Sequence, residues 1–219
     1  MGYEKVGLSA NAYYLSGVQF TKVGGEAATL NDLFPATDIP YGTEVLTLND
    51  QGQYDSYTYL EEAYDAVLDD FVPGWGDVGE EIVTDGIEPG VGIWVKAPEG
   101  CDLSQVGEVV SSDSVTIDVP AGSYTMIANP FPTGFNPNKV EWSTNLPFET
   151  EILTLNDQGQ YDSYTYLEEA YDAALDDFVS GWGDVGEEIV IDDIATNGQG
   201  LWIKAPEAIT ITISKTAAE

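Results

Sequence analysis

The sequence predicts a mainly β protein built from two tandem homologous β-sandwich-like modules, each with one short helix. Three observations lead to this fold class. A long segment occurs twice, short stretches alternate between apolar and polar residues as strands do, and turn-forming residues separate these stretches. With 43% apolar and 11% aromatic residues, the 219-residue chain can build a hydrophobic core in each half.

The repeat is the strongest of these observations. Residues 46–83 and 153–190 lie 107 positions apart and differ at only two of 38 positions. The flanks have diverged, since Trp94 aligns with Trp202 only at an offset of 108. Gene conversion of the middle, or a shared constraint on it, accounts for this mosaic. We place the first β module at residues 1–110 and the second at residues 111–219.

Strands are expected where apolar and polar residues alternate. Val115–Val119 and Ala208–Ile213 alternate in this way, and we expect half-buried strands whose edges are open to another chain. Val45–Leu48 and Gln53–Tyr59 are rich in β-branched and aromatic residues, and Asn49–Gly52 between them predicts a hairpin turn. The second module repeats this hairpin at the same place.

Two short strands carry a tryptophan each. Ile93–Lys96 and Leu201–Lys204 both stop at Ala-Pro, because proline lacks the N–H that a central strand needs. Trp94 and Trp202 stand in the middle of these strands, and we expect both to occupy equivalent buried positions.

One helix per module is expected inside the repeated segment. Thr58 and Glu61 have the spacing of a capping box. The apolar residues that follow fall on one helical face: Leu60, Tyr64, Val67, Leu68 and Phe71. Pro73-Gly74 would end this helix, and its copy would run from Thr165 to Phe178.

The charge excludes several classes of function. The chain has 39 acidic residues, six lysines, no arginine and no histidine, so its formal charge is −33. Nucleic-acid binding needs a basic surface, and catalytic triads and most zinc sites need histidine. We therefore expect a protein that is not an enzyme and has no nucleic-acid partner.

The single cysteine and the first residues of the chain bear on the compartment in which the protein works. Cys101 is the only cysteine, so the chain has no internal disulfide, and we expect an ordinary, partly buried thiol. No signal peptide is visible and no apolar run approaches the ~20 residues of a membrane helix. The acidic, Tyr- and Gly-rich, Lys-poor composition favours an extracellular or virion location, and a halophilic setting is an alternative.

Paired carboxylates recur in both copies of the repeat. With this many acids such pairs are typical of a solvated face, and calcium is the alternative to it. Asp69 and Asp70 lie near the end of the expected helix, where the helix dipole disfavours anions and a hard cation would relieve them. The candidate calcium ligands are Asp69, Asp70, Asp77, Asp176, Asp177 and Asp184. No other cofactor is expected.

Aromatic residues cluster in the same segment. The first copy contains Tyr54, Tyr57, Tyr59, Tyr64 and Trp75, and the second copy repeats them. Such residues fill a β core or a subunit interface, and exposed ones beside acids would form a platform for a glycan.

The end of each unit carries a resemblance. Pro89–Lys96 and Asn197–Lys204 share a Gly-x-Gly step followed by a Trp-containing strand that ends in lysine. This pattern resembles the end strand of tandem β modules in bacterial surface and phage virion structural proteins. The resemblance covers the last third of each unit and implies a structural protein, with no active-site residue to transfer.

Together these features predict a non-enzymatic structural protein that assembles with copies of itself, or with other coat or surface proteins, into a coat, a shell decoration or a filament. The alternative is a calcium- or glycan-binding module that uses the repeated acidic and aromatic segment twice. A third reading, an acidic inhibitor that imitates DNA, would need carboxylates in a helical array rather than among Gly-rich strands.

Overall fold

The structure is a computed structural model that describes residues 2–35, 39–49, 51–142, 146–156 and 158–215. These residues form sixteen strands, arranged in four antiparallel sheets, and one four-residue helix. The prediction of a mainly β, sandwich-like fold is therefore confirmed.

The first half of the chain holds two sheets. The larger one has the order β2 (Tyr13–Gly17), β7 (Gly92–Lys96), β4 (Glu44–Leu48), β5 (Tyr54–Asp65) and β6 (Asp70–Gly76). The smaller one has the order β1 (Gly2–Leu8), β8 (Cys101–Val109) and β3 (Phe20–Thr21).

The second half repeats this arrangement. Its larger sheet has the order β10 (Thr125–Ala128), β15 (Gly200–Lys204), β12 (Glu151–Leu155), β13 (Tyr161–Asp172) and β14 (Asp177–Gly183). Its smaller sheet has the order β11 (Glu141–Trp142), β16 (Ile209–Ser214) and β9 (Ser114–Val119). Seven strands of one half thus have a counterpart at the same place in the other.

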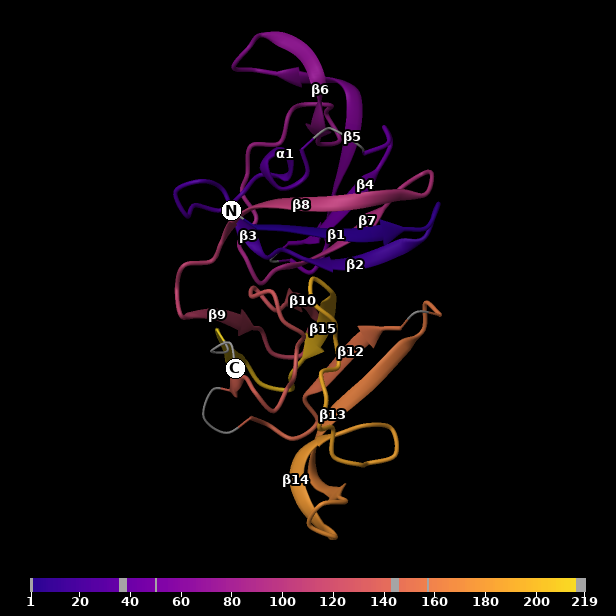
Figure 1. The fold of residues 1–219 in the computed structure, drawn as a ribbon, viewed down its shortest axis with the longest axis vertical. Coiled ribbons are helices and arrows are strands. Elements are labelled where there is room, and N and C mark those ends of the chain that lie inside the picture. Colours follow the sequence, from indigo (N-terminus) through magenta and orange to yellow (C-terminus); the bar gives the residue numbers. More distant parts are fainter. Residues whose placement is uncertain (1, 36–38, 50, 143–145, 157, 216–219) are drawn as a thin grey trace.

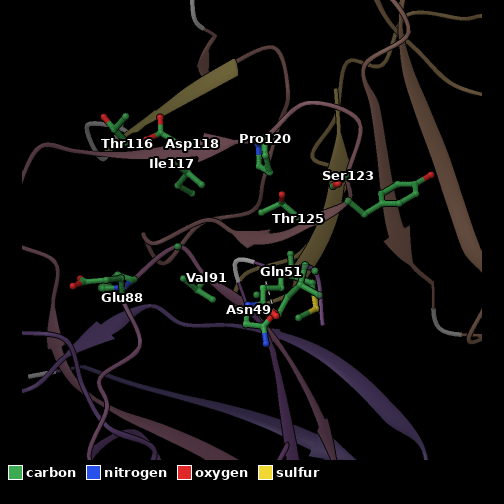
Figure 2. A pocket seen from close by; sticks show the side chains of 17 residues that line it. Asn49, Gln51, Glu88, Val91, Thr116, Ile117, Asp118, Pro120, Ser123 and Thr125 are labelled. Atoms are coloured by element: carbon green, nitrogen blue, oxygen red, sulfur yellow. Dashed lines mark hydrogen bonds between the residues drawn. The ribbon is translucent and has the colours of Figure 1, made fainter. Parts of the chain in front are cut away.

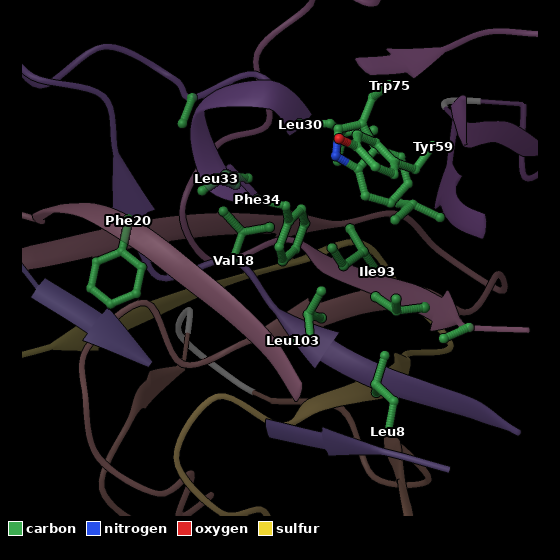
Figure 3. Close-up of a cluster of buried hydrophobic side chains, with 14 residues drawn as sticks. Leu8, Val18, Phe20, Leu30, Leu33, Phe34, Tyr59, Trp75, Ile93 and Leu103 are labelled. Atoms are coloured by element: carbon green, nitrogen blue, oxygen red, sulfur yellow. The ribbon is translucent and has the colours of Figure 1, made fainter. Parts of the chain in front are cut away.

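Each half has its own hydrophobic core between its two sheets. In the first half, Leu103 of the smaller sheet and Ile93 and Trp75 of the larger sheet belong to one buried cluster (Figure 3). In the second half, Ile211 and Trp182 belong to the corresponding cluster. Residues on the inner faces of both sheets alternate with outward residues, which is the pattern of a β-sandwich.

The predicted hairpins are confirmed by the strand pairing and by the described residues of their turns; Asp50 and Asp157 lie outside the described residues. Strands β4 and β5 pair in register around Asn49–Gly52, and the Asn49 side-chain oxygen accepts hydrogen bonds from the backbone N–H groups of Gln51 and Gln53 at 3.1 and 2.9 Å. Gly52 has a φ of +71°, which glycine adopts without steric cost. Asn156 makes the same bonds in the second half.

The helices expected over residues 58–71 and 165–178 are wrong. These residues form β5 and β6, and β13 and β14. Thr58, the expected helix cap, pairs with Glu44 across the β4–β5 ladder. The helix of the first half is instead α1 (Leu30–Leu33), capped by Thr29, and the described residues of the second half contain no helix.

The segment that was expected to be a helix contains a β-bulge. The register of β5 against β6 shifts between Leu60 and Ala63, so that two residues oppose one. A Cβ added to Gly76 would lie 2.8 Å from Leu60 Cδ1 and 3.5 Å from Ala63 Cβ. Two residues three positions apart therefore share one side of the strand, which is the spacing of a helical face.

The expected free edge at Ala208–Ile213 is also wrong. Strand β16 lies in the middle of its sheet, because β9 pairs with one side of it and the two-residue strand β11 with the other. Strand β9, which contains Val115–Val119, does lie at the edge of the sheet. Proline at Thr210 or Thr212 would therefore break a central strand rather than block an open edge.

The two halves meet through the outer faces of their larger sheets. The Gly17 N–H donates to Gly198 O at 2.7 Å, and the Ala128 N–H donates to Gly90 O at 2.8 Å. The two bonds are equivalent by the repeat, so the contact has approximate two-fold symmetry. Apolar side chains of both halves fill it: Leu15, Leu46, Leu48, Trp94, Met126, Leu155 and Trp202. The resulting molecule is elongated (Figure 1).

Candidate functional site

The hairpins β5–β6 and β13–β14 lie at opposite ends of the molecule (Figure 1). We call residues 61–83 and 168–190 the end lobes. They contain the outer part of these hairpins and the loop that follows. The two end lobes differ only at positions 67 and 73 and their counterparts 174 and 180, so the molecule presents nearly the same surface twice.

All six candidate calcium ligands lie in the end lobes. Asp69 and Asp176 occupy the hairpin turns, and each accepts a hydrogen bond at 2.8 Å from a tyrosine hydroxyl of its own strand, that of Tyr64 or Tyr171. This bond, with burial and nearby carboxylates, raises the pKa of both tyrosines. Asp70 binds the backbone N–H of the next residue, as does Asp177 in the copy.

Asp77 and Asp184 shape the second turn of each lobe. The Asp77 side chain accepts hydrogen bonds from the N–H groups of Gly79 and Glu81 at 2.8 and 3.1 Å, and Asp184 makes the same pair of bonds. Across the described ranges, no three His, Cys, Asp or Glu side chains gather as a metal site would require. The six aspartates thus serve as turn-forming acceptors in this structure, and their calcium role stays a prediction.

The end lobes expose apolar side chains to solvent, although the rings of Phe71 and Phe178 also contact Tyr64 and Tyr171 of their own hairpins. Val67 is 89% exposed and Val78 is 94% exposed. Val185, the copy of Val78, is 90% exposed. The other exposed apolar residues of the two lobes are Leu68, Phe71, Leu175 and Phe178. Exposed apolar patches are a common feature of protein-contact surfaces, so these side chains are candidate contact residues.

Carboxylates surround these apolar side chains. Each lobe has eight acidic residues and no basic residue, and in the first lobe these are Glu61, Glu62, Asp65, Asp69, Asp70, Asp77, Glu80 and Glu81. The two lobes together therefore carry sixteen of the 39 acids of the chain. Electrostatic repulsion between two such lobes is strong at low ionic strength and falls as salt or cations screen it.

A second set of functional-type side chains lies at the contact between the halves. Aromatic rings run across it from Tyr13 to Trp94, Trp202 and Tyr124, with centroid separations of 5.9, 6.5 and 6.2 Å. A lysine ammonium lies over the ring of each terminal tyrosine, Tyr13 and Tyr124. The hydroxyl of each of these tyrosines donates a hydrogen bond to a glutamate carboxylate. The hydrogen bond to Glu151, with burial and the charge of that carboxylate, raises the pKa of Tyr124 to about 12.

Trp94 and Trp202 occupy equivalent positions, as predicted, but they pack between the halves rather than inside their own sandwich. Trp94 is buried and Trp202 is half-buried. The tryptophans inside the two sandwich cores are Trp75 and Trp182. The sequence did not distinguish these two kinds of tryptophan.

Clefts open on both sides of this contact. One, of about 470 Å³, lies between the β4–β5 turn of the first half and strands β9 and β10 of the second, with Asn49, Asp118 and Thr125 in its walls (Figure 2). Its counterpart by the repeat, of about 680 Å³, includes Asn156 and Tyr14.

An aromatic groove of about 490 Å³ adjoins the larger cleft. Tyr13, Tyr54, Trp94 and Tyr161 line it, and the three tyrosines are about half exposed. Sequence analysis singled out Tyr54 and Tyr161 but missed Tyr13 and its counterpart Tyr124. The alignment of the two at an offset of 111 was the signal that could have found them.

Comparison with protein-family models, with curated proteins and with solved structures returned no match. The described helix of four residues is far too short to cross a membrane, and no described helix is long and apolar enough to do so. Function must therefore be argued from the end lobes and from the contact between the halves.

Proposed function

We propose that the protein is a non-enzymatic structural protein, a two-ended connector whose end lobes bind the end lobes of further copies. The observation that carries this proposal is that both ends of an elongated molecule expose nearly the same apolar side chains, with Ala174 in the second lobe at the place of Val67. In this proposal the chain belongs to a coat, a shell decoration or a filament on a virion or cell surface.

Symmetry determines what such contacts would build. A contact between one end lobe and the same lobe of another copy uses one surface on both sides, so each contact pairs two chains and is complete. Because every chain has two nearly identical lobes, a paired chain still has one free lobe. Repeated pairing therefore gives linear filaments, whereas a molecule with one lobe would stop at a dimer.

Charge makes this pairing conditional. Two lobes with eight carboxylates each repel one another, and the Debye length is about 8 Å at physiological ionic strength. Salt shortens the repulsion and divalent cations neutralise carboxylates directly, while burial of apolar side chains gains roughly 25 cal/mol per Å². We expect free monomers at low salt and growing filaments as salt or calcium rises.

Variants at one or both ends test the proposal. Leu68→Ser with Val78→Ser removes apolar groups from one lobe and should limit the protein to dimers at high salt or calcium. Adding Leu175→Ser and Val185→Ser should leave monomers. Val23→Ser is the matched control, because Val23 is also highly exposed but lies outside the lobes. Sedimentation velocity across salt and calcium measures the sizes, and a wild-type monomer under every condition would contradict the proposal.

The aromatic groove favours a second candidate function, the binding of a glycan. The half-exposed tyrosine rings beside Trp94 offer flat faces on which the C–H groups of a sugar would pack. Carboxylates such as Asp162 in the adjoining cleft would accept hydrogen bonds from the sugar hydroxyls. Tryptophan fluorescence during titration with soluble oligosaccharides tests this function. The Tyr54→Ala variant should abolish any change that the wild-type protein shows, with Tyr3→Ala as an exposed control outside the groove.

A further inference from the structure

Three buried side-chain oxygens near the contact between the halves have no hydrogen-bond partner. They are Glu4 Oε2 of β1, Gln105 Oε1 of β8 and Gln19 Oε1 of the segment between β2 and β3. Gln19 is 1% exposed and Gln105 is 3% exposed. A buried acceptor without a donor destabilises the fold, so three such acceptors together require an explanation.

The orientation of both glutamine amides is determined by their other contacts. Gln105 Nε2 donates to Gly17 O at 2.8 Å and to Ser16 Oγ at 3.0 Å. Gln19 Nε2 donates to two backbone carbonyls, those of Asn129 and Phe131, and to the Asn197 side-chain oxygen. Carbonyl oxygens accept only, so turning either amide round would place oxygen against oxygen. Both Oε1 atoms are therefore true acceptors without a donor.

The three side chains come together around one backbone contact, the bond from Gly17 N to Gly198 O. Glu4 and Gln105 are directly opposed in the β1–β8 ladder, so they share a face. Gln105 binds the carbonyl of Gly17, and the Glu4 carboxylate occupies the space where a Cβ of Gly198 would stand. Gln19 binds the side chain of the residue before Gly198.

The other half of the molecule shows that the fold does not require these polar groups. By the repeat, Val115 stands for Glu4 and Ile213 for Gln105, and the two are directly opposed in the β9–β16 ladder. Pro130 stands at the place of Gln19. At Gly90, the counterpart of Gly198, the nearest side chains to an added Cβ are Ile117 at 3.0 Å and Val115 at 3.7 Å. The same architecture is thus built with apolar side chains on one side of the two-fold and with three oxygen ligands on the other.

We propose that Glu4, Gln19 and Gln105 form a binding site for one calcium ion per chain. A carboxylate and two amide carbonyls are the oxygen ligands that calcium accepts, and its flexible coordination lets water or backbone carbonyls complete the shell. Magnesium, which needs near-octahedral geometry and holds its waters, fits this set less well. A bound ion would join β1, β8 and the segment after β2 to the loop of the second half at Gly198.

Among the described residues, no salt bridge gives Glu4 a cationic partner. The salt bridges between described residues are Lys5 with Asp102, Lys22 with Glu26 and Lys139 with Asp193, and none includes Glu4. This site is distinct from the six aspartates of the end lobes and independent of the proposed assembly.

Calcium titration of two charge-matched variants tests the site. Glu4→Gln removes one ligand charge, and Glu99→Gln removes one charge from an exposed loop. At constant ionic strength, calorimetry should find one tight calcium site per chain in the wild type and in Glu99→Gln. Its affinity should fall by at least about tenfold in Glu4→Gln, the range known for disturbed metal sites.

Stability gives a second measurement. Without calcium, Glu4→Gln should melt no lower than the wild type, because it removes a desolvated charge, and with calcium the order should reverse, because only the wild type binds the ion. If Glu4→Gln does not fold, the double variant Glu4→Val with Gln105→Ile takes its place in these measurements, because it copies the apolar pair of the second half. Equal calcium binding by wild type and Glu4→Gln, or tight binding that only end-lobe variants remove, would overturn the proposal.

Discussion

At the contact between the halves, Gly17 leaves room for the methyl group of Ala128. Moving this methyl group from Ala128 to position 17 tests how closely the two halves pack. Gly17 and Ala128 are equivalent by the repeat, and they face each other. A Cβ on Gly17 would overlap the Cβ of Ala128, while its next neighbours, Gly198 O and Ala128 Cα, would lie at 3.6 and 3.7 Å, which are ordinary contacts. One methyl group fits at this place and two do not.

We therefore expect Gly17→Ala alone to destabilise the protein by about 1–3 kcal/mol, the usual cost of overpacking. For a chain of this size this lowers the melting temperature by roughly 2–4 °C per kcal/mol. Adding Ala128→Gly should restore most of the loss, because the double variant only moves the methyl group to the other half. The coupling in the double-mutant cycle should therefore approach the full cost of the single change.

Urea unfolding followed by tryptophan fluorescence measures these effects, because Trp94 and Trp202 lie at the contact. Gly7→Ala is the control, since the nearest atom to its new Cβ would lie 3.9 Å away. The reasoning is refuted if Gly17→Ala is neutral, or if the double variant is as unstable as the single one.

Two further predictions concern the core and the aromatic row. Trp75→Ala should cost about 3–5 kcal/mol because it empties a fully buried site, whereas Trp75→Phe should cost much less because it also removes an indole N–H that has no partner; thermal unfolding compares the two. The raised pKa of Tyr124, about 12, means that its bond to Glu151 stabilises the fold fully below the unfolded tyrosine pKa of about 10 and is lost as pH rises toward 12. Unfolding midpoints between pH 9 and 12 should fall in the wild type and fall less in Tyr124→Phe, and identical profiles would refute the assignment.

The hairpins could be predicted because their cause is local. Asn49 and Gly52 suit the turn through their own side-chain and backbone preferences, and the flanking β-rich runs then need only to pair with each other. The helix prediction failed for residues 58–71 because apolar residues with helical spacing there belong to a bulged β-hairpin. Strand β5 forms in place of a helix because it pairs with β4 and β6, and a local sequence pattern does not report this pairing.

The candidate sites were also only partly predictable from the sequence. Val67, Leu68 and Phe71 were singled out from the sequence, but as the buried face of a helix, and only the hairpin exposes them. The central place of β16 could not be predicted either. The strand that covers its second side, β11, is only two residues long and so has no recognisable sequence pattern.

The duplication, the β class, the hairpin turns and the lack of histidine and arginine can be read from the chain alone, since these depend on composition and on neighbours along the chain. The tertiary structure was needed to show which tryptophans fill the sandwiches and which join the halves. It also decided that Glu4 and Gln105, 101 residues apart, stand opposite each other beside Gly198. The physical reason is that side chains distant in sequence meet through strand register and through the packing of two sheets, and neither is written in any local pattern.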